Sequence, residues 1–129
     1  MIYEDRVTKE YLEDAIANAG VKIITGTYTG DGAETRLIDL GFTPRAVFVI
    51  SSGSGTYLYS PSTGDMIYYG GIAIGTATSP GGVVPAVKIV DGGFQVAQSD
   101  ADGVITGTTG RRKARSNNAN AIYRYLAIA

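Results

Sequence analysis

The stretch GTYTGDGAETRLIDLGFTPRAVFVI, residues 26–50, contains three extended runs separated by two glycine-containing breaks. GDG at 30–32 is a turn signal, and ETRLIDL at 34–40 follows it as a short strand. GFTP at 41–44 is a second break, because proline biases the residue before it toward extended geometry. RAVFVI at 45–50 combines β-branched and aromatic residues, which indicates a buried strand. This part of the chain therefore predicts a β-rich domain with tight turns.

Outward from this stretch, alternating apolar and polar residues predict further strands. AVKIVDGGFQVAQ, at 86–98, is a hairpin in which the glycines after Asp91 supply the positive φ angles of a tight turn. The last run, AIYRYLAIA, predicts a strand inside a sheet, with Ile122, Arg124, Leu126 and Ile128 on one face. Other strands are expected at 21–29, at 57–59 and at 67–75. In the last of these, Gly70 and Gly71 indicate a bulge or a close backbone approach. Polar loops are expected at 51–66, around the short strand at 57–59, and at 76–85 and 99–120.

Together these runs predict an all-β fold, an antiparallel β-sandwich of about seven or eight short strands. One short N-terminal α-helix is expected in front of it, over residues 8–19. The helix would carry one apolar stripe, formed by Val7, Tyr11, Leu12, Ala15, Ile16 and Ala19. A helix of about twelve residues is marginal alone in water, so the stripe needs a partner. That partner is the following domain, the same helix in other protomers, or another protein.

We therefore divide the chain into an N-terminal helical anchor or oligomerisation segment, 1–20, and a β-sandwich domain, 21–129. The whole chain has 129 residues, 44% apolar and 18% charged, with a formal net charge of −1. This composition is too apolar for a disordered chain. The net charge is too small to attract nucleic acid or an anionic membrane by long-range electrostatics. No run approaches the roughly 20 apolar residues of a membrane span, and the acidic N-terminus has no export-signal core.

The chain contains no cysteine and no histidine, which removes disulfides, thiolate metal sites and the commonest general base. The remaining catalytic candidates are the charged residues Asp31, Glu34, Arg36 and Asp39. Glycoside hydrolysis needs two carboxyls about 5–10 Å apart across a cleft, but Glu34 and Asp39 point to opposite faces of a strand. We therefore expect a turn aspartate and the solvated face of a structural sheet. No motif is specific enough to indicate an enzyme.

SDADG, at 99–103, alternates the acidic residues Asp100 and Asp102. Calcium prefers such oxygen ligands, but the further ligands of an EF-hand loop are missing. A turn between strands is the favoured interpretation, and metal binding by these two residues stays an open alternative. We predict neither a structural metal nor a cofactor.

Two groups of residues are candidates for binding a ligand. The basic cluster RRKAR, at 111–115, fits an anionic ligand or else a solvated loop. Tyrosine offers a flat apolar face and a hydroxyl, which suits sugar or protein recognition. We expect Tyr68 to pack in a sheet, while Tyr57 and Tyr59 are exposed. The candidate ligand-binding residues are Tyr57, Tyr59, Arg111, Arg112, Asn117 and Asn118.

The same opening stretch, followed in order by YYGGIAIG, VKIVDGGFQV and NANAIYRYLAIA, resembles small β-domains of bacteriophage and prophage tail proteins. The resemblance covers about residues 24–129. Those domains look similar to the H-type lectin sandwich, which assembles with three-fold symmetry and binds sugars in some members. The resemblance implies a homotrimeric virion component at a host-facing position, assembled in the host bacterial cytoplasm. It transfers no ligand-binding residue.

Two functions follow as alternatives. The first is a tail-associated attachment module whose loops bind a bacterial surface polysaccharide. The second is a purely structural decoration or adaptor protein of the capsid or tail, docked onto other virion proteins through the N-terminal helix. Neither function implies membrane insertion, and nucleic acid is not an expected partner.

Overall fold

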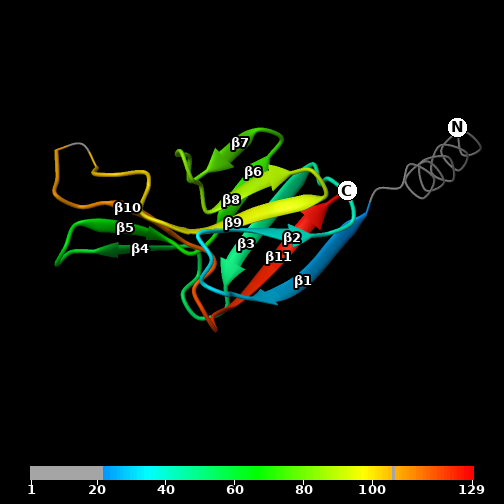
Figure 1. Cartoon of the computed structure of the whole chain (residues 1–129), viewed down its shortest axis with the longest axis horizontal. Helices are drawn as coiled ribbons and strands as arrows, with labels where there is room; N and C mark the ends of the chain where they lie inside the picture. The colour runs from blue at the N-terminus through cyan, green and yellow to red at the C-terminus, as the bar shows by residue number, and fades with distance from the viewer. Residues whose placement is uncertain (1–21, 106) are drawn as a thin grey trace, which may run out of the picture.

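The computed structural model describes residues 22–105 and 107–129. These residues form eleven strands in two sheets, so the predicted all-β class is confirmed (Figure 1). The predicted helix over 8–19 lies outside the described residues. The strands are β1 (Ile23–Thr29), β2 (Thr35–Asp39), β3 (Ala46–Ser51), β4 (Tyr57–Ser60), β5 (Asp65–Tyr68), β6 (Gly71–Ile74), β7 (Ala77–Ser79), β8 (Val87–Val90), β9 (Gly93–Ser99), β10 (Arg112–Arg115) and β11 (Ile122–Ile128).

The first sheet is antiparallel throughout, in the order β1-β11-β3-β6-β7. β11 pairs with β1 on one side and β3 on the other, which confirms that the last run lies inside a sheet. Its residues alternate as predicted, since Tyr123 and Ala127 are fully buried whereas Ile122 and Arg124 are exposed. The first sheet thus turns one face to the core and one face outward.

The second sheet has the order β2-β9-β10-β5-β4, with β8 beside β9. β10 and β5 run parallel, with Arg112 opposite Met66. The prediction of a purely antiparallel sandwich is therefore wrong at this pair, and the second sheet is mixed. Between β5 and β10 the chain passes through the first sheet, as β6 and β7, and then returns to the second sheet as β8 and β9. This long connection allows β10 to lie beside β5 in the same direction.

The run predicted as one strand at 67–75 is divided between the two sheets. β5 ends at Tyr68 in the second sheet, and β6 begins at Gly71 in the first. Gly70 sits where the backbone crosses against β3, because a Cβ added there would overlap the carbonyl oxygen of Val49. Short strands also form within segments expected as loops, including β7 before the cis Ser79–Pro80 bond. These additions raise the strand count to eleven.

The core lies between the inner faces of the sheets. Fully buried side chains from β3, β9 and β11 meet there, and the rings of Tyr28 and Tyr123 stack with centroids 4.9 Å apart. The Tyr28 hydroxyl donates to the carbonyl oxygen of Ser116 at 2.6 Å, and the Tyr123 hydroxyl donates to that of Arg115 at 2.6 Å. Burial raises the pKa of Tyr28, which keeps its hydroxyl protonated as a donor. These core tyrosines therefore also hold the loop that follows β10.

Ser116 joins the ends of two strands that border β9. β8 pairs with β9 from Gly93 to Val96, and β10 pairs with the end of β9, at Gln98 and Ser99. The fully buried Ser116 hydroxyl donates to the carbonyl oxygen of Ala86 at 2.6 Å and accepts the Ala97 N–H at 2.9 Å. The side chain thereby satisfies backbone groups that the sheet ladder leaves open at this junction.

Candidate binding surface

Asp31 and Arg36, two charged residues of the opening stretch, lie together at the β1–β2 turn. Asp31 Oδ1 accepts the Ala33 N–H at 2.9 Å and the Asn117 Nδ2–H at 2.6 Å, and Asp31 Oδ2 lies 3.5 Å from Arg36 Nε. The Ala33 N–H, followed by the Asn117 amide and the Arg36 charge, lowers the pKa of the Asp31 carboxyl. The Asp31 carboxylate is thus engaged in fixing the turn.

Arg36 and Asp39 have further local partners, while Glu34 is exposed. Arg36 Nη1 donates to the carbonyl oxygen of Thr29 at 2.6 Å, and the guanidinium lies over the Tyr28 ring, 5.6 Å from its centroid. Asp39 accepts the Gly41 N–H at 2.9 Å. This arrangement ties β1, β2 and the 116–121 loop together, and it presents a framework in place of the facing carboxyls that glycoside hydrolysis requires.

The candidate tyrosines lie on an arm that projects from the sandwich. The arm consists of β4, β5 and β10, and in Figure 1 it extends to the left, together with the segment that precedes β10. β4 forms its free edge. Tyr57 and Tyr59 are about half exposed, as expected from the sequence, while Tyr68 packs against the small buried cluster of Ala86, Ala97 and Ala114. The rings of Tyr57 and Tyr68 are tilted against each other, with centroids 5.4 Å apart.

Strand register brings three of the predicted residues to one face of the arm. Tyr59 lies opposite Met66, and Met66 lies opposite Arg112 on the far side of β5. Residues directly opposite on neighbouring strands point to the same side of a sheet, and Tyr57 shares that side with Tyr59 because strand residues alternate. We call this set, Tyr57, Tyr59, Met66, Tyr68 and Arg112, the tyrosine face.

The opposite face of the arm contains Leu58, Ile67 and Lys113, which share a row across the three strands. Lys113 Nζ lies 3.1 Å from Asp65 Oδ2, and Asp65 Oδ1 accepts the Arg111 N–H at 2.8 Å. The Arg111 N–H, followed by Lys113, lowers the pKa of the Asp65 carboxyl. This face is therefore stabilised by its own ion pair.

The predicted basic cluster is divided by this alternation. Lys113 pairs with Asp65, and Arg115 pairs with Asp100. Arg111 and Arg112 are exposed, and neither forms an ion pair within the part of the chain that the structure describes. Arg112 belongs to the tyrosine face, whereas Arg111 precedes it in the chain and falls on the opposite side. The four charges thus do not converge on one anion site.

The side chains of the two candidate asparagines, Asn117 and Asn118, form hydrogen bonds within the protein. Asn117 is fully buried, and its side chain contacts the Asp31 carboxylate, the carbonyl oxygen of Ala33 and Arg36 Nη1. Asn118 is half-buried, its backbone N–H donates to the Tyr123 hydroxyl, and its Oδ1 accepts from Gln98 Nε2. The structure therefore places both away from the tyrosine face, with their side chains engaged inside the protein.

Asp100 and Asp102 likewise have separate partners. Asp100 pairs with Arg115, while Asp102 Oδ1 accepts the N–H groups of Val83 and Val84. The two carboxylates thus anchor different segments. Within residues 22–105 and 107–129, no group of three or more histidine, cysteine or carboxylate side chains is placed to hold a metal ion.

A hollow of ≈ 440 Å³ lies at the base of the arm, and sequence reasoning missed it. Tyr57 and Tyr68 of the arm line it, together with Phe48 and Ile50 of the first sheet and Pro80, which follows β7. Gly70 and Gly71 also line it, at the point where the chain crosses between sheets. In the sequence, the one signal for this site was the pair Gly70–Gly71, which indicated a bulge or a close backbone approach. The other lining residues come from separate segments, and their grouping depends on the fold.

No protein-family model matches this chain, and the search of curated proteins and the search of solved structures gave no match. Among the residues that the structure describes, no helix is long and apolar enough to cross a membrane. The tyrosine face and the adjoining hollow are therefore the structural features from which a function can be inferred.

Proposed function

We propose that this chain is a bacteriophage virion protein, tail-associated, that attaches the particle to a polysaccharide on the host surface. The observation that carries the proposal is the tyrosine face, where two exposed tyrosine rings and an exposed arginine lie on one side of a projecting arm. The motif resemblance to tail-protein domains supports the virion setting. Assembly would take place in the host bacterial cytoplasm.

The chemistry of the tyrosine face suits a sugar chain. Tyrosine rings pack against the apolar C–H faces of sugar rings, and their hydroxyls bond sugar hydroxyls. Tyr57 is already supported by the ring of Tyr68, so little side-chain freedom is lost when a ligand binds. Arg112 adds a planar cation with several donors, which favours uronic acids or other acidic sugars.

We therefore expect Arg112→Ala to weaken binding to acidic polysaccharides by about tenfold, the usual effect of losing a charge-assisted hydrogen bond, and to spare neutral ones. An array of bacterial surface polysaccharides, probed with the folded full-length protein, measures this. Arg111→Ala is the matched control, because it removes the same charge from the neighbouring residue, which precedes β10 and lies on the opposite side of the arm. Equal losses in the two variants would mean that only general charge matters.

The second candidate function is a capsid or tail decoration or adaptor protein with a purely structural role. The observation that favours it is the amount of exposed apolar surface on the first sheet, which includes Phe48, Ile50 and Ile74. Particles that lack this protein but still adsorb to host cells at the normal rate would support it over attachment. The homotrimer implied by the resemblance stays a prediction, which light scattering on the full chain tests.

A further inference from the structure

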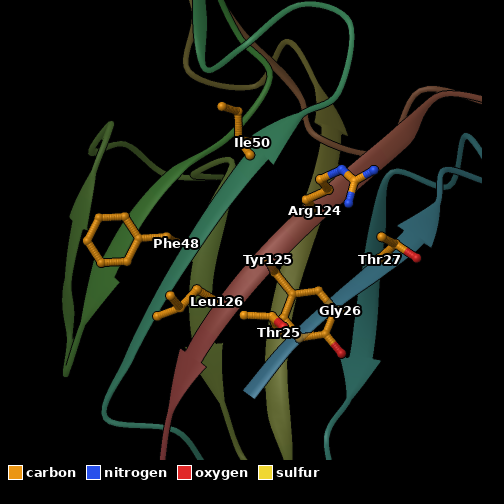
Figure 2. Close-up of a pocket in the computed structure, with 8 residues that line it drawn as sticks. All are labelled: Thr25, Gly26, Thr27, Phe48, Ile50, Arg124, Tyr125 and Leu126. Atoms are coloured by element: carbon orange, nitrogen blue, oxygen red, sulfur yellow. The ribbon is translucent and has the colours of Figure 1, made fainter. Parts of the chain in front are cut away.

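The outer face of the first sheet carries an apolar hollow of ≈ 400 Å³ (Figure 2). Phe48 and Ile50 of β3 and Leu126 of β11 provide its apolar lining, and Thr25 and Thr27 of β1 form the other side. Phe48 and Ile50 leave 46% and 47% of their surface exposed, although β3 lies inside the sheet. Large apolar residues exposed side by side on a sheet indicate a surface that another segment covers.

This outer face also has a positive charge that no negative charge of the same sheet balances. The five strands of the first sheet contain one charged residue, Arg124, and no carboxylate. Arg124 lines the hollow and takes part in none of the ion pairs within the described residues. The segment that fits here is therefore apolar on one side and acidic beside its apolar stripe.

Residues 1–21 have that composition. They contain five acidic and two basic residues, a formal charge of −3, whereas the remaining residues contain nine basic and seven acidic residues, a formal charge of +2. The apolar stripe from Val7 to Ala19 is accompanied by Glu10, Glu13 and Asp14. On a helix, Asp14 lies beside Val7 and Tyr11, at the border of the stripe.

We propose that residues 7–19 of the same chain form a helix that covers this hollow, with an acidic residue near Arg124. The connection is short, since Gly20, Val21 and Lys22 lead directly to Ile23, where β1 starts at the border of the outer face. Loops of about two to six residues commonly join a helix to a strand packed beneath it. A thirteen-residue helix spans about 20 Å, which fits along the roughly 24 Å of seven-residue β1.

A second copy of the same outer face is the less suitable occupant. A two-fold contact places the same patch on both sides, so two such faces joined across the hollow bring two Arg124 guanidinium groups together without a carboxylate. The acidic N-terminal segment supplies the missing negative charge. The inference does not depend on the proposed attachment function, because it concerns how the free chain covers its own surface.

The cysteine-free chain allows a direct test by engineered disulfides. Ala15→Cys, in the middle of the stripe, is combined with Thr25→Cys or, as a second design, Thr27→Cys on the outward side of β1. We expect an intrachain disulfide, seen as a monomer-mass species on non-reducing electrophoresis and in intact mass. The control pair combines Ala15→Cys with Leu37→Cys, which is half exposed on the second sheet, and it should yield several-fold less intrachain product.

The charge part of the inference has its own readout. Arg124→Glu, added to the Ala15→Cys/Thr25→Cys pair, should lower the yield of the intrachain cross-link several-fold, whereas Lys88→Glu, an exposed charge reversal on β8, should leave that yield unchanged. Circular dichroism checks that each variant is folded. A dimer-mass disulfide at both β1 positions would overturn the same-chain assignment, and equal yields with the β1 and Leu37 positions would overturn the docking site. An unchanged yield in Arg124→Glu would overturn the role of that residue.

Discussion

Single buried polar residues hold together the segment that follows β10. The Ser116 hydroxyl bridges Ala86 and Ala97, and Asn117 bonds across to the β1–β2 turn. The two core tyrosines donate to the carbonyl oxygens of Arg115 and Ser116. A loop with few apolar side chains is thus fixed by hydrogen bonds whose partners are excluded from water.

Ser116→Ala tests this role. We expect it to lower the free energy of unfolding by about 1–3 kcal/mol, because the Ala97 N–H and the Ala86 carbonyl are left buried without this partner. Urea unfolding followed by circular dichroism measures the change. Ser62→Ala, at an exposed position, is the control and should stay within about 0.5 kcal/mol of the parent protein. Similar losses in both variants would contradict a bridging role.

The two depressed carboxyl pKa values predict an acid dependence of stability. Asp31 and Asp65 both have folded-state pKa values below the ordinary value of 3.8, so their contributions are present above that pH and are lost as pH falls through the folded pKa. At pH 6, Asp31→Asn and Asp65→Asn should each be less stable than the parent protein. That gap should narrow as pH falls below about 4. A gap that stays constant in urea titrations from about pH 6 to about pH 2.5 would rule the linkage out.

At the scale of elements, the local patterns predicted strands well where the alternation was complete. The runs expected at 34–40 and 45–50 became β2 (Thr35–Asp39) and β3 (Ala46–Ser51), and the hairpin at 86–98 became β8 and β9. These strands are specified by neighbouring residues and by turn glycines, which a sequence displays directly.

The pairing of distant elements could not be predicted in the same way. The parallel contact of β5 with β10 joins Met66 to Arg112, and no local pattern encodes it. The exposure of Tyr57 and Tyr59 was predictable from a polar, tyrosine-containing loop. Their grouping with Arg112 depends on that non-local register, and so does the separation of Arg112 from Arg111.

The crossing between sheets at Gly70 is an element-scale feature with a sharp steric test. We expect Gly70→Ala to destabilise the protein by about 1–3 kcal/mol, because the new methyl group meets the Val49 carbonyl, a backbone atom that cannot rotate away. Gly53→Ala, where an added Cβ meets nothing within 4 Å, is the matched control. Thermal unfolding of both variants decides the matter, and indistinguishable midpoints would show that the crossing tolerates a side chain.

At the scale of the whole molecule, the two sheets provide different surfaces. The second sheet extends into the arm and presents the tyrosine face. The first sheet presents a broad apolar outer face with Arg124 as its one charge. We assign the tyrosine face to ligand binding and the outer face to the acidic N-terminal segment. The two surfaces adjoin, because Phe48 and Ile50 line both hollows, but the variants that test the two proposals change different residues.

The most direct test of the attachment proposal measures the binding of fluorescently labelled protein to intact bacterial cells. The cells are a panel of strains that differ in their surface polysaccharide. The account predicts saturable binding to at least one type, and at least about tenfold weaker binding by the Tyr57→Ala/Tyr59→Ala double variant. Leu58→Ala, on the opposite face of the same strand and similarly exposed, should bind like the parent protein. Folded protein that binds no cell type, or a double variant that binds as tightly as Leu58→Ala, would contradict the account.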